Sequence, residues 1–156
     1  MSESSSRSVF IYESIGMIFI IVLGSMLHFT FEWSGGQPLV GVFSAVNESV
    51  WEHLKLGVWP SLLYALIEYM PLRRRASNFF VAKAACAYLI PVIIPVVFYS
   101  YTAFTGESIL AVDLLTFFVA VIIGQLASYK LLTYKQLPRS LNIIAACALL
   151  LLAAVF

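Results

Sequence analysis

The sequence predicts an all-α membrane protein with five transmembrane helices in one bundle. Of its 156 residues, 62% are hydrophobic and only 11% are charged. Its mean hydropathy of +0.95 is typical of a membrane chain rather than of a soluble domain. A membrane-spanning helix needs roughly 20 mostly apolar residues. The segments that meet or approach this length are residues 10–31, 51–70, 79–101, 109–132 and 141–156. They leave almost nothing for a separate soluble domain, so we interpret residues 1–156 as a single integral membrane domain.

The basic residues predict how this domain is oriented. The chain has nine Lys and Arg residues. Only Lys55 lies on the side of the loops that follow the first and third spans. The others lie before the first span or around the loops that follow the second and fourth: Arg7, Arg73, Arg74, Arg75, Lys83, Lys130, Lys135 and Arg139. Under the positive-inside rule, the N-terminus is cytoplasmic and the loops 32–50 and 102–108 are extracytoplasmic. The net charge is only +1, with no basic face for nucleic acid, so the expected partner is the lipid bilayer.

The first span and the loop after it have distinct patterns. Gly16, Gly24 and His28 follow one four-residue row of the span that ends at Glu32, and small residues in such a row predict close approach of a neighbouring helix. Residues 33–46 contain three glycines and a proline, which predict an irregular outer loop.

The second span begins beside several polar residues. Asn47 suits an N-cap, which would place the Glu48 carboxylate in the first turn, where it complements the helix dipole. Pro60 lies inside this span, and we expect it to bend the helix.

The third and fourth spans carry further packing signals. Pro91 and Pro95 should bend the third span. Ala120, Gly124 and Ser128 form a stripe of small residues on the fourth, which predicts a close helix-packing face. The fifth span is apolar but short.

Titratable groups gather at the extracytoplasmic ends of the predicted helices. His28 lies four residues below Glu32, His53 five below Glu48, and Asp113 five below Ser108. At 1.5 Å per residue, all three groups lie roughly 6–8 Å below the helix ends. If the first, second and fourth spans are neighbours, these groups could converge in a common polar pocket.

The residues around this pocket admit three interpretations. They could bind a divalent metal ion, since imidazole nitrogens and carboxylate oxygens suit zinc, iron or manganese. They could form a substrate or proton relay with His53 and Asp113 as titrating groups. They could also be structural, with helix capping by Asn47 and Glu48, an anchoring Trp51, and a Glu52–Lys55 pair. The candidate ligand-binding or relay residues are His28, Glu32, Asn47, Glu48, Trp51, Glu52, His53, Glu68 and Asp113. The candidate metal ligands are His28, Glu48, Glu52, His53 and Asp113.

Glu13 and Glu68 form a second polar layer near the cytoplasmic face. We expect them to pair with Arg7 or with the arginines of segment 73–75, whose long side chains can reach them. The alternative is a polar path from His53 past Tyr64 to Glu68.

Several segments together form a recognisable pattern: 28–36, 38–56 with its block Asn47–Leu54, Pro60, 67–69 and 111–117. In these segments the chain resembles a family of small prokaryotic multi-pass membrane proteins of unknown function. The resemblance extends over essentially the whole chain. It implies a location in the plasma membrane of a bacterium or archaeon, and it implies no activity.

Three functions remain open from the sequence. The first is a small transport or binding protein whose outer pocket holds a cation, a proton or a small polar solute. The second is an intramembrane metal-dependent hydrolase with Glu52 or Glu48 as general base. The third is a structural or helper subunit of a membrane complex. A divalent metal ion is the cofactor that the residues point to.

Overall fold

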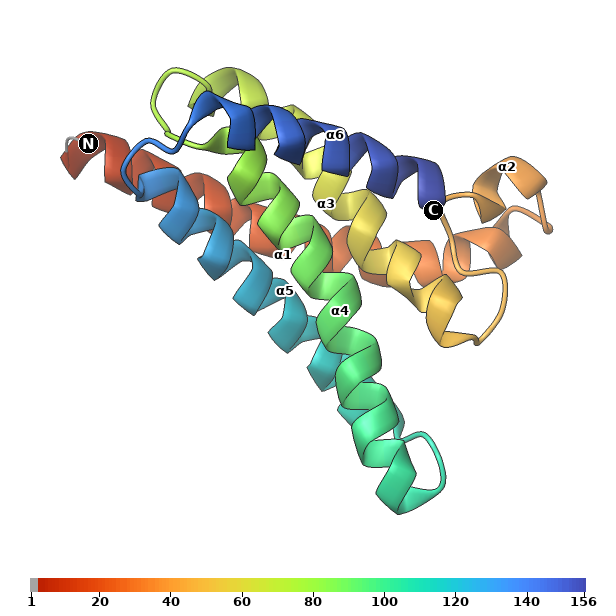
Figure 1. Cartoon of the computed structure of the whole chain (residues 1–156). Coiled ribbons are helices and arrows are strands. Elements are labelled where there is room, and N and C mark those ends of the chain that lie inside the picture. Colours follow the sequence, from red (N-terminus) through yellow and green to blue (C-terminus); the bar gives the residue numbers. More distant parts are fainter. Residues whose placement is uncertain (1–2) are drawn as a thin grey trace.

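The computed structural model describes residues 3–156, and these form six α-helices (Figure 1). The helices are α1 (Glu3–Trp33), α2 (Pro38–Gly41), α3 (Val50–Leu72), α4 (Phe79–Thr105), α5 (Leu110–Thr133) and α6 (Arg139–Val155). The predicted all-α class is confirmed, and each of the five predicted segments contains one long helix. The segment predicted to be an irregular loop holds only the single turn α2.

Three of the described helices are long and apolar enough to cross a membrane. They are the Ser5–Trp33 part of α1, Phe79–Thr105 (α4) and Leu110–Thr133 (α5). Helix α6 is apolar but has only 17 residues. Helix α3 has 23 residues, but Glu52, Lys55 and Glu68 interrupt its apolar sequence. The chain is therefore an all-helical protein with three candidate membrane spans.

Helix α3 lies between α1 and α4, and α6 runs along α4 and touches α3 (Figure 1). This central position explains why every residue from Leu54 to Val58 is buried, whichever way it points. Helices α4 and α5 form an antiparallel hairpin, and α1 packs against α5 as well as α3.

Two glycines allow the central helices to approach closely. A Cβ atom at Gly24 of α1 would lie 2.4 Å from the backbone oxygen of Leu56 in α3. A Cβ atom at Gly57 would lie 2.4 Å from a methyl group of Ile90 in α4. Any larger residue would push these helices apart, so the predicted close approach along the first span is confirmed at Gly24.

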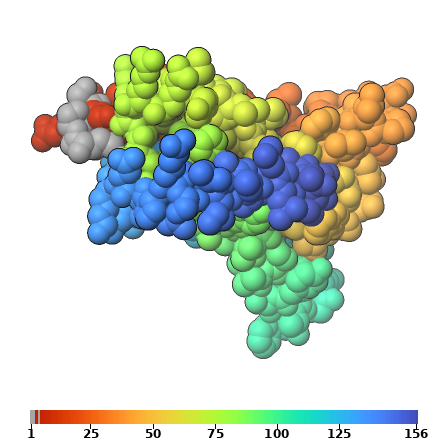
Figure 2. Space-filling model, turned by 45° about the horizontal axis from the view of Figure 1, so that its top comes forward, coloured from red at the N-terminus to blue at the C-terminus, as the bar shows by residue number. Residues whose placement is uncertain are grey.

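The hairpin tip is much less enclosed than the rest. Ile90 is the last buried residue of α4, and Thr116 is the first buried residue of α5, so none of residues 91–115 is buried. Helix α4 continues through Pro91 and Pro95 into this region. The space-filling view shows the tip projecting from the body of the molecule (Figure 2). The other helices therefore do not enclose residues 91–115, which face one another and the surroundings.

Candidate functional site

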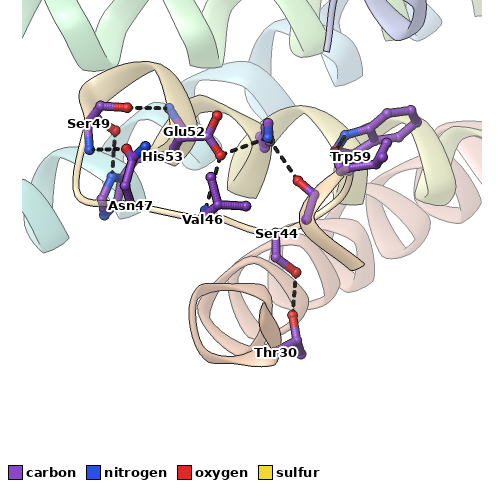
Figure 3. Close-up of polar contacts among 11 residues, drawn as sticks. Thr30, Ser44, Val46, Asn47, Ser49, Glu52, His53 and Trp59 are labelled. Atoms are coloured by element: carbon purple, nitrogen blue, oxygen red, sulfur yellow. Dashed lines mark hydrogen bonds and ion pairs between the residues drawn. The ribbon is translucent and has the colours of Figure 1, made fainter. Parts of the chain in front are cut away.

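The start of α3 is fixed by the polar turn before it (Figure 3). Ser49 is the N-cap, and its hydroxyl oxygen accepts a hydrogen bond from the Glu52 backbone N–H at 3.3 Å. Asn47 accepts a hydrogen bond from the Ser49 N–H at 2.9 Å through its side-chain oxygen, so it shapes the turn rather than capping the helix. The prediction that Asn47 is the cap was wrong. The cap at Ser49 places Glu52 in the first turn and leaves Glu48 outside the helix.

Glu52 is held by protein contacts on several sides. Its Oε2 atom accepts hydrogen bonds from the Lys55 ammonium at 2.7 Å and from the Val46 N–H at 3.1 Å. The same ammonium donates to the Gly41 carbonyl oxygen at 2.9 Å. The Glu52 carboxylate therefore ties the loop to α3, as the structural interpretation of the Glu52–Lys55 pair expected.

His28, His53 and Glu48 come together at one end of α1 and α3. The Nε2 atoms of the two imidazoles are 3.2 Å apart. Glu48 Oε2 lies 3.4 Å from His53 Nε2 and 4.0 Å from His28 Nε2. The Glu48 side chain is 84% exposed, while those of His28 and His53 are 34% and 29% exposed. The three potential ligand atoms thus form a compact triangle, and its Glu48 corner is open to the surroundings.

A hydrogen bond to the backbone orients the His53 ring. Its Nδ1 atom lies 2.9 Å from the Ser49 carbonyl oxygen. In the tautomer that donates this bond, the proton is on Nδ1, and the Nε2 lone pair faces His28 and Glu48. Metal-binding histidines in proteins usually have such a partner on their second nitrogen. The N-cap residue of α3 therefore also orients a candidate ligand.

Asp113 lies elsewhere. It is in the first turn of α5, near the projecting hairpin tip, and its Oδ1 atom accepts a hydrogen bond from the Tyr101 hydroxyl at 2.6 Å. Within residues 3–156, the group of His, Cys, Asp and Glu side chains close enough to share an ion contains neither Asp113 nor Glu52. The expectation that Asp113 converges with the histidines failed because α5 diverges from α1 and α3 at this end.

Two other candidates lie beside the triangle rather than in it. Glu32 is exposed in the last turn of α1. The Trp51 ring is half-exposed and stacks on Phe156, with ring centroids 4.7 Å apart. Neither adds a fourth nitrogen or oxygen ligand to the triangle.

Glu13 and Glu68 are buried and contact Lys83 rather than the arginines. The Lys83 ammonium is 2.5 Å from Glu13 Oε1 and forms an ion pair with Glu68. It also donates a hydrogen bond to the Ser128 hydroxyl at 3.0 Å. The expected pairing with Arg7 or segment 73–75 was wrong.

The role of Lys83 was missed because it was interpreted as a flanking, topology-setting residue. The sequence indicates only that such charges need partners, and it does not indicate which partners they have. Three charges inside apolar segments need partners within the bundle, because lipid supplies none.

Comparison with known proteins gives one finding about the whole chain. The family described as Family of unknown function (DUF6512) matches residues 1–156. The chain belongs to this family. Neither the curated proteins nor the solved structures contain a match.

A hollow near the candidate site of this DUF6512 member is apolar. A volume of about 500 Å³ lies between the loop after α1 and the end of the chain, and its lining includes Phe31, Pro38, Val46 and Phe156. Lys55 is the charged residue in the lining, and it is committed to Glu52. This hollow does not provide the expected polar pocket, and its lining includes none of the three triangle residues.

Proposed function

We propose that the chain is a membrane protein that binds one divalent transition-metal ion through His28, His53 and Glu48. The observation that carries this proposal is the convergence of two imidazole Nε2 atoms and one carboxylate oxygen within 4.8 Å of one another. Two histidines and a carboxylate form a common ligand set for zinc in sites that keep a fourth position open.

The spacing of the triangle fits such an ion. Zinc–nitrogen and zinc–oxygen bonds of about 2.0–2.2 Å place neighbouring tetrahedral ligands roughly 3.3–3.6 Å apart. The distances of 3.2 and 3.4 Å around His53 Nε2 are close to this range. Only the 4.0 Å separation of His28 and Glu48 must shorten, and the exposed Glu48 side chain can supply that movement.

We further propose that all five long helices cross the membrane, with the N-terminus in the cytoplasm and the metal site on the extracytoplasmic side. The distribution of basic residues supports this orientation. Helix α3 is long enough to span, and its charged side chains lie beside opposite charges, with Lys55 against Glu52 and Lys83 against Glu68. The 17 residues of α6 are at the short end of spanning helices.

Within this proposal, ion binding or uptake has more support than hydrolysis. A hydrolase needs a general base near the metal-bound water. Glu48 would be a ligand, and Glu52 is occupied by Lys55 and the Val46 N–H. We therefore infer a receptor or carrier for the ion, consistent with a small transport or binding protein, rather than an intramembrane hydrolase.

The test is elemental analysis of the purified protein after loading with Zn²⁺ or Mn²⁺ and removal of free ion. We expect one bound ion per chain, lost in His28→Ala and in His53→Ala. Acidification should release it, because protons compete with the metal for both imidazoles. Uptake into proteoliposomes then distinguishes a carrier from a receptor.

Asp113→Asn is the matched control, because it removes a carboxylate from the same end of the protein without touching the triangle. It should retain the ion. Absence of stoichiometric metal at every pH, or equal loss in Asp113→Asn and the histidine variants, would contradict the proposal.

A further inference from the structure

Four polar side chains meet inside the bundle, one from each of four helices. Glu13 comes from α1, Glu68 from α3, Lys83 from α4 and Ser128 from α5. All are nearly inaccessible, with exposed fractions of 3%, 0%, 4% and 0%, respectively. We call these four residues the inner ion cluster. It lies far along α3 from the metal-site triangle, in the half next to the basic loops.

The contacts of the cluster centre on one ammonium group and one carboxylate oxygen. Lys83 Nζ donates to Glu13 Oε1 at 2.5 Å and to Ser128 Oγ at 3.0 Å. The Ser128 hydroxyl in turn donates to Glu13 Oε1 at 3.1 Å. Lys83 also forms an ion pair with Glu68. One cation is thus shared by two carboxylates.

The cluster is enclosed by apolar layers on both sides. One layer contains Ile20, Tyr64, Cys86 and Val121, and the other contains Val9, Leu72, Phe79 and Leu132. On each of the four helices, the polar residue lies between a member of one layer and a member of the other. The cluster is therefore separated from both ends of the bundle by packed side chains.

Its depth also places it within hydrocarbon if the helices span. Lys83 lies four residues after the first residue of α4, and Glu68 lies four before the last residue of α3. These offsets correspond to roughly 6 Å along each helix. At such a position, an uncompensated charge that is also buried among protein side chains is unfavourable.

The charges of the cluster do not balance when all three groups are ionised. Two carboxylates and one ammonium leave a net charge of −1. The other facing groups cannot correct this: the Tyr64 hydroxyl donates to the Tyr12 carbonyl oxygen, Cys86 is neutral as a thiol, and Gln125 is uncharged. Among the described residues, Glu13 Oε2, both Glu68 oxygens and Gln125 Oε1 have no hydrogen-bond partner, although Glu68 Oε1 forms the ion pair with Lys83. Each glutamate thus keeps one oxygen that can carry a proton.

We infer that the inner ion cluster is an intramembrane proton-binding site, in which Glu13 and Glu68 share one exchangeable proton. Binding transfers one proton from a hydronium ion of the aqueous phase: one O–H bond of the hydronium ion breaks, one O–H bond forms on a carboxylate, and the net charge of the cluster changes from −1 to 0. Lys83 sets the number of protons at one by neutralising the other carboxylate. This site is distinct from the proposed metal site in position and in ligand.

The test counts protonated carboxylic acids by infrared difference spectroscopy of the purified full chain in lipid. At neutral pH we expect the carbonyl band of one protonated acid, shifted in D₂O and lost as pH is raised. Glu13→Gln and Glu68→Gln should each abolish the band, because the remaining glutamate is neutralised by Lys83. Lys83→Met should double it, because both carboxylates must then be protonated. The opposite responses distinguish proton counting from general damage to the fold.

Asp113→Asn is the control, since Asp113 also accepts a short hydrogen bond, and the variant should keep the band. The proposal is overturned if the wild-type protein, which needs no mutation, lacks the band at neutral pH. It is also overturned if both glutamine variants keep the band or if Asp113→Asn removes it. Loss of the band when Na⁺ is added at constant pH would assign the site to a metal cation instead.

Discussion

Glu48 and Glu52 lie four residues apart, yet their environments differ sharply. The Glu48 side chain is 84% exposed beside two histidines, whereas that of Glu52 is 12% exposed and bonded to Lys55. The difference follows from the cap at Ser49, which leaves one carboxylate before the helix and places the other inside it. The position of one capping residue thus determines which carboxylate stays exposed and which is bonded to Lys55.

Lys55→Met should destabilise the protein. It removes the donor to Glu52 and to the Gly41 carbonyl in a nearly buried site, for which the expected cost is about 1–3 kcal/mol. Thermal unfolding in detergent should therefore show a midpoint lower by several degrees. Glu107→Gln, at an exposed position of the hairpin tip, is the control and should leave the midpoint unchanged. An unchanged midpoint for Lys55→Met would show that the pair contributes little.

The correct cap could have been predicted at this scale. Ser49 and Glu52 have the Ser-x-x-Glu spacing of a capping box, which predicts a helix start at Ser49 rather than at Asn47. The convergence of His28 with His53 was predictable only in part. The rise per residue of a helix placed both histidines at one depth. That α1 and α3 pack side by side depends on tertiary contacts such as that at Gly24.

At the scale of the helices, the contact between α1 and α3 links stability to the proposed metal site. Gly24 is four residues before His28, and Leu56 is three residues after His53. The close approach of Gly24 to the Leu56 carbonyl therefore fixes the distance between the two imidazoles about one turn away.

Gly24→Ala should affect both properties, because the new methyl group would meet a backbone oxygen that cannot move independently of its helix. We expect a loss of about 1–3 kcal/mol in stability, as for other overpacked contacts, together with weaker Zn²⁺ binding. Calorimetric titration and thermal unfolding measure the two effects.

Ser25→Ala, at the next and exposed position, should change neither property. Wild-type affinity and unfolding midpoint in Gly24→Ala would show that α1 and α3 can separate without consequence.

The positions of the helices were largely predictable, because long apolar runs bounded by polar loops define them. The partners of the charges inside those helices were not. Lys83 is four residues into α4, where a snorkelling lysine and a buried one have the same sequence pattern. Only the packing of α1, α3 and α5 around it distinguishes the two. The predicted convergence of Asp113 with the histidines failed for a similar reason. The depth of a residue along α5 does not indicate where α5 diverges from α1 and α3.

At the scale of the whole molecule, two polar centres lie at different levels of one apolar bundle. The metal-site triangle is partly exposed at the end where α1 finishes and α3 begins, and the inner ion cluster is enclosed in the other half. Apolar residues such as Ile20, Tyr64 and Ile90 lie between these levels. The two centres therefore differ in access to water as well as in ligand chemistry.

The proposed orientation makes a direct prediction for labelling in intact cells. Glu107→Cys in the α4–α5 turn and Gln136→Cys in the α5–α6 segment are both at exposed positions. A membrane-impermeant maleimide should label Glu107→Cys from outside and Gln136→Cys only after permeabilisation. The unmodified chain, with Cys86 buried and Cys147 on an apolar helix, gives the background. The reverse pattern would invert the topology and move the triangle to the cytoplasm.

The hairpin formed by residues 91–115 depends on its surroundings in a way that the other helices do not. It has no buried side chain, so in the proposed membrane orientation acyl chains supply the apolar environment that α3 obtains from its neighbours. The thickness of the host bilayer then determines how much of this hairpin is solvated by lipid and how much by water. Transfer from a long-chain membrane to a short-chain detergent should therefore change the conformation of this hairpin more readily than that of the central helices.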